Sequence, residues 1–240
     1  MKLIIIRHGD PDYEHDSLTP TGRLEAEALS ERMKNIRVDK CYVSPLGRAK
    51  ETAAPCLAKM NMQAEEMLWL REFAPKVDRP EKTGVAWDWL PADRAKMPYA
   101  FDDERWTEFP AFKKARVREE IEWIHKEFEA LLERHGYRKK GKIFEAVRPN
   151  NDTVVLFCHF GLECVLLSYL LSLPIFTLWH ATIAAPTGVT TVATEERREG
   201  IAQFRMLSFG DTSHLYAAGM QPSFSGRFRE CYTNEDERRD

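Results

Sequence analysis

The chain has 240 residues, of which 43% are hydrophobic and 30% charged, and its 35 basic and 38 acidic side chains give a formal net charge of −3. This composition excludes a disordered tail protein, a collagen-like repeat and a disulfide miniprotein, and the length suits a large α/β domain with a closed core. The near-neutral charge gives no electrostatic reason to expect a nucleic-acid partner. On bulk charge alone, the chain is expected to be indifferent to anions.

The first predicted strand is the apolar run at residues 3–6, which is β-branched at three of its four positions. Such a run is typical of a strand buried on both faces. The strand ends abruptly in Arg7-His8-Gly9-Asp10-Pro11, a loop signal. Thr19 can then cap a helix that has Pro20 at its first position.

Two further strands each end in polar or basic residues. Residues 41–43 predict the second strand, and the Ser-Pro-Leu-Gly sequence at residues 44–47 breaks it before a helix opens near Arg48. Residues 154–158 predict the third strand, which gives way to His159 and an apolar helix. Strands that alternate with helices predict a three-layer α/β/α sandwich with a mainly parallel sheet. Near the end, residues 187–193 and 201–209 predict a hairpin or an antiparallel pair at the edge of the sheet.

Residues 73–152, between the second and third of these units, are rich in tryptophan and proline. Their second half has helical periodicity, because Ile121, Ile124, Phe128 and Leu131 recur at steps of three and four residues. We interpret this segment as a helical, lid-like insertion in a single domain that spans residues 1–240.

The five cysteines are an odd number without CxxC spacing, which predicts free thiols in a reducing compartment. The first apolar run is too short for a signal-peptide core, and no uninterrupted apolar run reaches transmembrane length. We therefore expect a soluble, cytoplasmic protein without a membrane partner.

The residues that follow the three predicted strands can meet at one point. The carboxyl ends of parallel strands lie at the same edge of a sheet, where ligands bind, so Arg7, His8, Arg48 and His159 are expected to converge. Two arginines supply donors that match phosphate oxygens. They also keep a nearby imidazole neutral, and such a histidine can attack phosphorus and form a phosphohistidine.

The motifs at these positions resemble the histidine phosphatase (phosphoglycerate mutase-like) superfamily. The similarity covers both ends of the chain in the family's order and leaves residues 73–151 uncovered. The similar segments are Leu-Ile-Ile-Ile-Arg-His-Gly at 3–9, Leu-Thr-Pro-Thr-Gly-Arg at 18–23, Ser-Pro-Leu-Gly-Arg-Ala-Lys-Glu-Thr-Ala at 44–53, Cys-His-Phe-Gly at 158–161 and Gly-Asp-Thr-Ser-His-Leu at 210–215.

The resemblance implies a role for each site residue. His8 becomes the phosphorylated nucleophile, while Arg7, Arg48 and His159 hold the phosphate. Glu72 stands where the family has its proton donor, although its surroundings depart from the family's pattern, and Glu65, Glu66 or an acid in the insertion remain alternatives. Ser44 stays open between a contact with phosphate and a turn at the strand end, and His214 stays open between the border of the pocket and a packing contact. A second Arg-His-Gly, at residues 134–136, follows a helical run and is interpreted as a helix end.

The expected function is metal-independent hydrolysis of a small phosphate monoester through a phosphohistidine on His8, with no metal ion or cofactor. A phosphoglycerate mutase-type phosphotransferase is the first alternative. The residues after Gly9, Asp-Pro-Asp-Tyr at 10–13, differ from the Glu-Ser continuation typical of mutases and so favour hydrolysis. The second alternative is a non-catalytic module that binds phosphate or another protein. The oligomeric state is left open.

Overall fold

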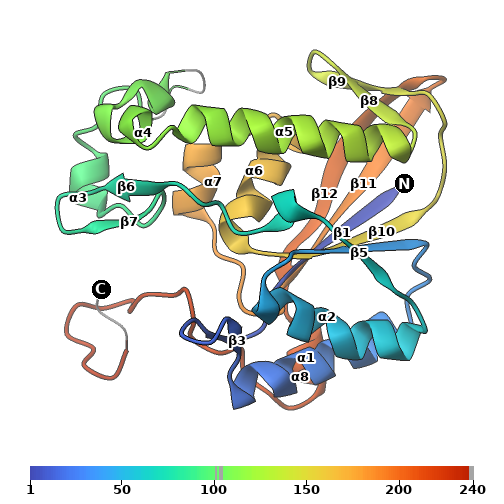
Figure 1. Cartoon of the computed structure of the whole chain (residues 1–240), viewed down its shortest axis with the longest axis horizontal. Coiled ribbons are helices and arrows are strands. Elements are labelled where there is room, and N and C mark those ends of the chain that lie inside the picture. The colour runs from blue at the N-terminus through green and yellow to red at the C-terminus, as the bar shows by residue number, and fades with distance from the viewer. Residues whose placement is uncertain (101, 103–104, 238–240) are drawn as a thin grey trace.

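The protein is described here from a computed structural model that covers residues 1–100, 102 and 105–237. Residues 101 and 103–104 of the predicted insertion, and the last three residues of the predicted domain, lie outside this description. The described chain forms a large central sheet with helices on both faces, as Figure 1 shows. The three-layer α/β/α architecture predicted from the sequence is therefore confirmed.

The described residues form an eight-stranded sheet in the order β5-β4-β10-β1-β11-β12-β9-β8. The strands are β1 (Lys2–Arg7), β4 (Lys40–Val43), β5 (Ala64–Glu66), β8 (Tyr137–Lys140), β9 (Ile143–Ala146), β10 (Thr153–Cys158), β11 (Val189–Arg198) and β12 (Ile201–Asp211). Strands β5, β4, β10 and β1 pair in parallel, whereas β11, β12, β9 and β8 continue the sheet in antiparallel pairings. The sheet is thus mixed, and not mainly parallel as the sequence predicted.

The antiparallel half is larger than expected because two hairpins join the sheet. The predicted hairpin β11–β12 is confirmed, but it lies inside the sheet next to β1 and not at an edge. Residues 137–146, which we assigned to the helical insertion, form the hairpin β8–β9, and β9 pairs with β12. The helical periodicity of the preceding residues gave no indication of this pairing, because pairing between distant strands depends on tertiary packing.

Strand β1 has an apolar side chain on each face of the sheet. Ile4 and Ile6 pack in one core with residues of α1 (Pro20–Met33) and α2 (Gly47–Met60). Leu3 and Ile5 belong to the core on the other face, which includes residues of α5 (Val117–Arg134), α6 (Phe160–Leu171) and α7 (Ile175–Ala181). Alternation along one strand therefore explains why helices cover both faces. The short helix α8 (Ser213–Ala217) lies beside α1 (Figure 1).

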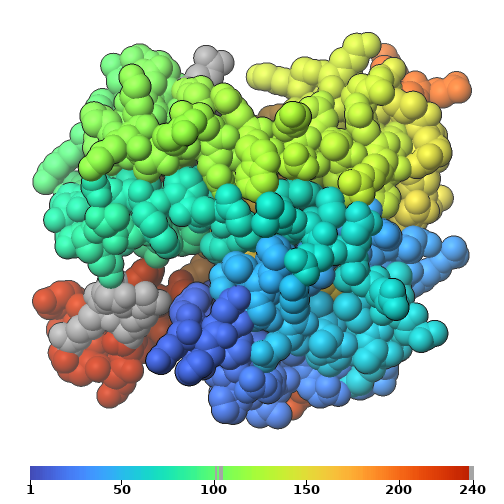
Figure 2. Space-filling view, in the orientation of Figure 1, coloured from blue at the N-terminus to red at the C-terminus, as the bar shows by residue number. Residues whose placement is uncertain are grey.

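The insertion occupies the α5 side of the sheet. Figure 2 shows its green and cyan residues over the upper half of one face, above the blue surface of the first two βα units. Apart from α5, β8 and β9, its described elements are β6 (Lys76–Asp78), β7 (Thr83–Val85), α3 (Pro91–Arg94), the 3₁₀ turn η2 (Trp106–Glu108) and α4 (Pro110–Lys114). Rings of Trp87 and Trp106 both contact the ring of Trp179 on α7. These tryptophans therefore contribute to the hydrophobic core.

Three short elements complete the described chain: β2 (Pro11–Asp12), β3 (Ser17–Leu18) and the 3₁₀ turn η1 (Leu68–Leu70). Strands β2 and β3 pair as a small hairpin directly after β1. None of the helices in the described part of the chain has the length and apolar character needed to cross a membrane.

Candidate phosphate site

The sheet brings the predicted site residues together at the carboxyl ends of three neighbouring parallel strands. Arg7 is the last residue of β1 and is in register with Cys158 at the end of β10. On the other side of β10, Phe157 is in register with Val43 at the end of β4. His8, His159 and Ser44 each follow one of these three strands directly. The convergence expected from the sequence is therefore present in the fold.

The rings of His8 and His159 lie side by side in this site, with centroids 5.1 Å apart and planes 55° apart. Nδ1 of His8 is 2.7 Å from the carbonyl oxygen of Gly9, and since a carbonyl only accepts, this nitrogen carries the proton. In the neutral ring, Nε2 then has a free lone pair. This is the nitrogen that can act as a nucleophile.

Burial lowers the pKa of His8 well below its ordinary value, and the positive charges of Arg7 and Arg48 lower it further. The pKa of His159 is also well below its ordinary value, mainly because of burial and then because of His8 and the same two arginines. Both rings are therefore neutral at physiological pH. A neutral imidazole beside two guanidinium groups remains available as a nucleophile.

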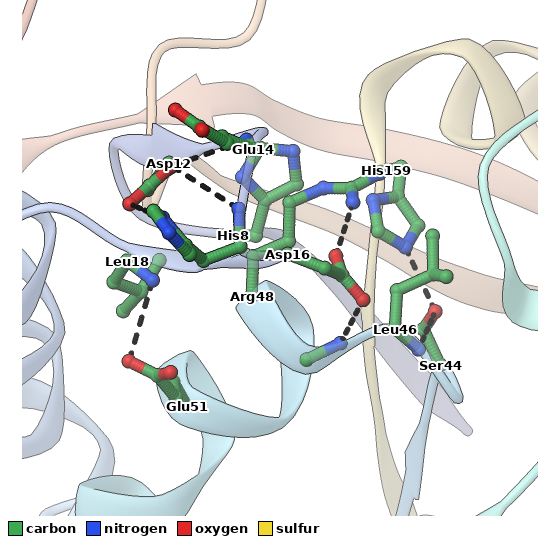
Figure 3. A network of polar contacts seen from close by, with 12 residues as sticks. His8, Asp12, Glu14, Asp16, Leu18, Ser44, Leu46, Arg48, Glu51 and His159 are labelled. Atoms are coloured by element: carbon green, nitrogen blue, oxygen red, sulfur yellow. Dashed lines mark hydrogen bonds and ion pairs between the residues drawn. The ribbon is translucent and has the colours of Figure 1, made fainter.

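The two ring nitrogens of His159 differ in their hydrogen-bond partners. Nε2 of His159 lies 2.8 Å from Oγ of Ser44, which also accepts a hydrogen bond from the backbone N–H of Leu46 (Figure 3). The Ser44 hydroxyl can donate its own proton to Nε2, and in that arrangement the ring proton of His159 lies on Nδ1. Nδ1 of His159 is buried and has no hydrogen-bond partner among the described residues. A phosphate oxygen would satisfy this donor.

The two arginines approach the histidines from different elements. Arg7 donates from Nη1 to the carbonyl oxygens of Ala184 and Ser225. Arg48 is in the first turn of α2 and donates from Nη1 to Oδ1 of Asp16 at 2.5 Å. Both side chains are largely buried, so their charges act on the histidines through little water. Two guanidinium groups and the N-terminus of a 14-residue helix can together bind a tetrahedral dianion.

Close backbone packing fixes the loop that carries His8. Gly9 donates its N–H to Oγ1 of Thr52 on α2, and Asp10 donates its N–H to the buried carboxylate of Glu25 on α1. A Cβ on Gly22 would lie 2.3 Å from the carbonyl oxygen of Asp10. Only glycine fits where α1 meets this loop, and this explains the Thr-Gly sequence at residues 21–22 in structural terms.

Glu72 lies at the N-terminus of α6, the helix that begins at Phe160, directly after His159. Its Oε1 accepts hydrogen bonds from the N–H groups of Phe73, at 2.8 Å, and Leu162, at 3.0 Å, and Oε2 accepts a longer one from Gly161. Burial raises the pKa of Glu72, and these backbone donors and the charge of Arg48 offset part of the increase. The carboxyl group is thus placed near the site and holds its proton to a higher pH than an ordinary glutamate.

The alternative acids are directed to other partners. Glu65 forms ion pairs with Lys40 and Arg134, and Glu66 forms one with Lys50. Among the open residues, Ser44 contacts His159 directly. His214 lies behind the site, because its Nε2 is 2.9 Å from Oγ1 of Thr187, whose N–H bonds to the carbonyl oxygen of His8.

Asp16 is a member of this network that no motif or spacing in the sequence identifies. Its two carboxylate oxygens accept hydrogen bonds from Arg48 and from the N–H of Gly47. One signal was present: acidic residues occupy four of the seven positions from Asp10 to Asp16. An acidic run alone is usually a solvated loop, and only the fold shows that its last carboxylate reaches the phosphate site.

The fold and the site together define an α/β protein in which two buried arginines lie beside two buried histidines at the strand ends. A sequence profile described as the Histidine phosphatase superfamily (branch 1) matches residues 3–206. The chain belongs to this superfamily. A shorter match links it to a probable phosphatase of Schizosaccharomyces pombe, with 35% identity over 66 residues, which is 24% of this chain and 32% of that protein.

Solved structures share the fold over most of its length. A phosphoserine phosphatase from Entamoeba histolytica, in complex with phosphoserine, has a TM-score of 0.60 and 21% identity, and the match covers 89% of this chain and 98% of that one. A mycobacterial glucosyl-3-phosphoglycerate phosphatase in complex with VO3 has a TM-score of 0.55 and 21% identity, covering 86% and 97% of the two chains. At these identities the similarity concerns the fold.

Proposed function

We propose that this protein is a metal-independent phosphatase that hydrolyses a small phosphate monoester through a phosphohistidine on His8. The observation that carries the proposal is the His8 ring itself. It is buried and neutral, its Nδ1 is bound to a carbonyl, and two arginines and a second histidine surround it. Membership of the histidine phosphatase superfamily supports the same assignment.

In the proposed first step, Nε2 of His8 attacks phosphorus in line with the ester oxygen. The P–N bond forms as the P–O bond to the leaving group breaks, and Glu72 donates a proton to that oxygen. In the second step, Glu72 accepts a proton from water, which attacks phosphorus and breaks the P–N bond. Arg7, Arg48 and Nδ1 of His159 stabilise the charge on the other phosphoryl oxygens in both steps.

The substrate class rests on the relatives. Structures of the same fold are named phosphoserine phosphatase and glucosyl-3-phosphoglycerate phosphatase, and one of them contains phosphoserine. A small phosphorylated metabolite is therefore the substrate class we assign. The insertion at residues 73–152, which places Trp87 against Phe160 beside the site, is proposed to cover the leaving group. Four buried free cysteines support a reducing, cytoplasmic location.

The decisive experiment measures hydrolysis of an aryl phosphate in excess EDTA by the natural protein, His8→Ala and a matched control, His15→Ala. His15 is an exposed histidine in the turn that follows β2, and it pairs with Asp12. We expect full activity with EDTA, a loss on the order of 10³-fold or more in His8→Ala, and little change in the control. Natural protein quenched in alkali, in which the P–N bond of a phosphohistidine is stable, should carry one phosphoryl group on the peptide that contains His8.

Each contrary outcome identifies what is wrong. Inactivation by EDTA would exclude the metal-independent mechanism, and an active His8→Ala would exclude His8 as the nucleophile. Transfer of the phosphoryl group to an added phosphoglycerate, in preference to water, would favour a mutase. Phosphate binding without turnover of any ester would favour the non-catalytic module.

A further inference from the structure

A carboxylate of the protein already occupies part of the phosphate site. Asp16 lies in the four-residue turn between β2 and β3. Its Oδ1 accepts from Nη1 of Arg48 at 2.5 Å and its Oδ2 accepts from the N–H of Gly47 at 2.7 Å (Figure 3). An arginine fork and the first backbone amide of a helix are the donors that commonly bind phosphate oxygens.

We propose that Asp16 is an internal competitor for the phosphate site: its carboxylate takes the place of a phosphoryl oxygen on Arg48 and Gly47, and an incoming phosphate displaces it. The inference builds on the proposed function, because it concerns the same site. A carboxylate and a phosphate dianion repel one another and cannot both be bound by the same donors at low cost. Asp16 therefore sets how tightly the site binds phosphate.

The turn that carries Asp16 lies at the surface of the protein. The side chain of Asp16 is 42% exposed, whereas that of Arg48 is 11% exposed. The β2–β3 hairpin has two paired positions, and Tyr13, Glu14 and His15 in its turn are exposed. Segments with few buried contacts open at low free-energy cost.

The base of the hairpin is fixed by other contacts. The hydroxyl of Thr19 donates to the carboxylate of Asp10 at 2.7 Å, and Glu25 accepts from the N–H of Asp10 at 2.8 Å. Displacement of Asp16 would thus swing the exposed turn and leave His8, at the other end of the loop, in place. The backbone of Asp16 adopts the left-handed region, with φ of 48°, which costs an aspartate more than the right-handed region.

A purely structural role for Asp16 makes the opposite prediction. Leu46, at the N-cap of α2, provides no side-chain hydrogen bond to the helix, so Asp16 also caps α2 from a distance. If capping were its only role, removal of its charge would lower stability and would leave phosphate affinity unchanged or weaker. If Asp16 competes with phosphate, removal of its charge tightens phosphate binding.

The test measures the affinity for inorganic phosphate by titration calorimetry in the natural protein, Asp16→Asn and Asp12→Asn. Asparagine keeps the volume of Asp16 and an oxygen that can accept from Gly47, but it carries no charge. Asp12 is the matched control, because it lies in the same hairpin and its carboxylate bonds to the turn residues Glu14 and His15. We expect phosphate to bind about 5- to 50-fold more tightly to Asp16→Asn and within about twofold of the natural affinity to Asp12→Asn.

Unchanged or weaker phosphate binding by Asp16→Asn, relative to Asp12→Asn, overturns the inference. Asp16→Ser provides a second measurement if the asparagine variant does not fold, because serine also caps helices and is uncharged. Phosphate binding is measured without turnover. An absence of ester hydrolysis by the natural protein would therefore contradict the proposed function. It would not decide the role of Asp16, which the phosphate affinities test separately.

Discussion

His8 shows how burial, more than any single neighbour, sets the protonation of this site. Burial is the largest cause of the lowered pKa of His8 and of His159, and it is also the largest cause of the raised pKa of Glu72. Each group shifts toward its neutral form, because charge is costly away from water. The two arginines therefore remain the principal positive charges of the proposed phosphate site.

A second buried acid lies close to this site. Glu163 is fully buried in the first turn of α6, and its carboxyl oxygens have no ion-pair partner among the described residues. Burial raises its pKa to about 8, although Thr190 and then Arg7 act in the other direction. The folded protein therefore holds a proton on Glu163 at neutral pH, and the unfolded chain releases it near the ordinary value of 4.5.

This difference predicts how stability depends on pH. The folded pKa is raised, so the favourable contribution of the bound proton is complete below about pH 4.5 and is lost as the pH rises through about 8. Over that range Glu163 should decrease the free energy of unfolding by at most about 1.4 kcal/mol per pH unit. Glu163→Gln should flatten the slope, measured by urea unfolding at pH 5 and pH 8. An equal slope in Glu163→Gln and in the exposed control Glu122→Gln would contradict the assignment.

At the scale of elements, the N-terminus of α6 connects the second histidine with the acid. His159 is the N-cap of α6 and provides no side-chain cap, and Glu72 from the loop after η1 accepts hydrogen bonds from the first turn instead. A Cβ on Gly161 would lie 2.4 Å from the ring of Trp87 and 2.8 Å from Oε1 of Glu72. Glycine at this position therefore lets the acid and the insertion approach the helix end together.

Glu72→Gln separates the chemical role of this residue from its role at the helix end. Glutamine can still accept from the α6 amides, so the fold should be retained, but it cannot donate a proton in the manner of a carboxylic acid. We expect kcat for an alkyl phosphate to fall by about 10²-fold or more, and kcat for an activated aryl phosphate to fall far less. Glu66→Gln, which removes an exposed acid paired with Lys50, is the control. Equal slowing of both esters would move the proton-donor role to another group.

At the scale of the whole molecule, two hydrophobic cores lie on opposite faces of the central sheet. The core beneath α5, α6 and α7 includes residues of the insertion, of the scaffold helices and of the sheet. The other core lies under α1 and α2. Both share the strands β1, β4 and β10, whose side chains alternate between them. Loss of the central strands would therefore expose both cores at once.

The shared strands predict a single cooperative unfolding transition. All six tryptophans of the chain belong to the core that contains the insertion or pack against it. Tryptophan fluorescence therefore reports on that core, while far-ultraviolet circular dichroism reports on the helices of both. We expect the two signals to give the same midpoint in a urea titration. Separate midpoints would show that the insertion unfolds as an independent unit and would contradict a single domain.

Local sequence was informative where a residue's position depends on its own strand. The apolar runs before Arg7, Ser44 and His159 predicted buried strands, and the geometry of parallel strands then predicted that their ends would meet. The same reasoning separated the two Arg-His-Gly sequences: the copy at residues 134–136 ends α5, where Gly136 has a φ of 91°. The first Arg-His-Gly follows a buried strand and the second follows a helix, so the preceding element distinguished the candidate site from the helix end.

The sequence by itself thus determined that Arg7, His8 and His159 lie at strand ends and that Arg48 opens the helix after a strand, because an apolar run is a local property of the chain. Only the tertiary structure decided that β8 and β9 complete the sheet, that Glu72 lies at the N-terminus of α6 and that Asp16 binds Arg48. These contacts join segments separated by tens of residues, so no local pattern in the sequence specifies them. Bulk charge likewise indicated indifference to anions, whereas folding concentrates two arginines beside two neutral histidines at one point.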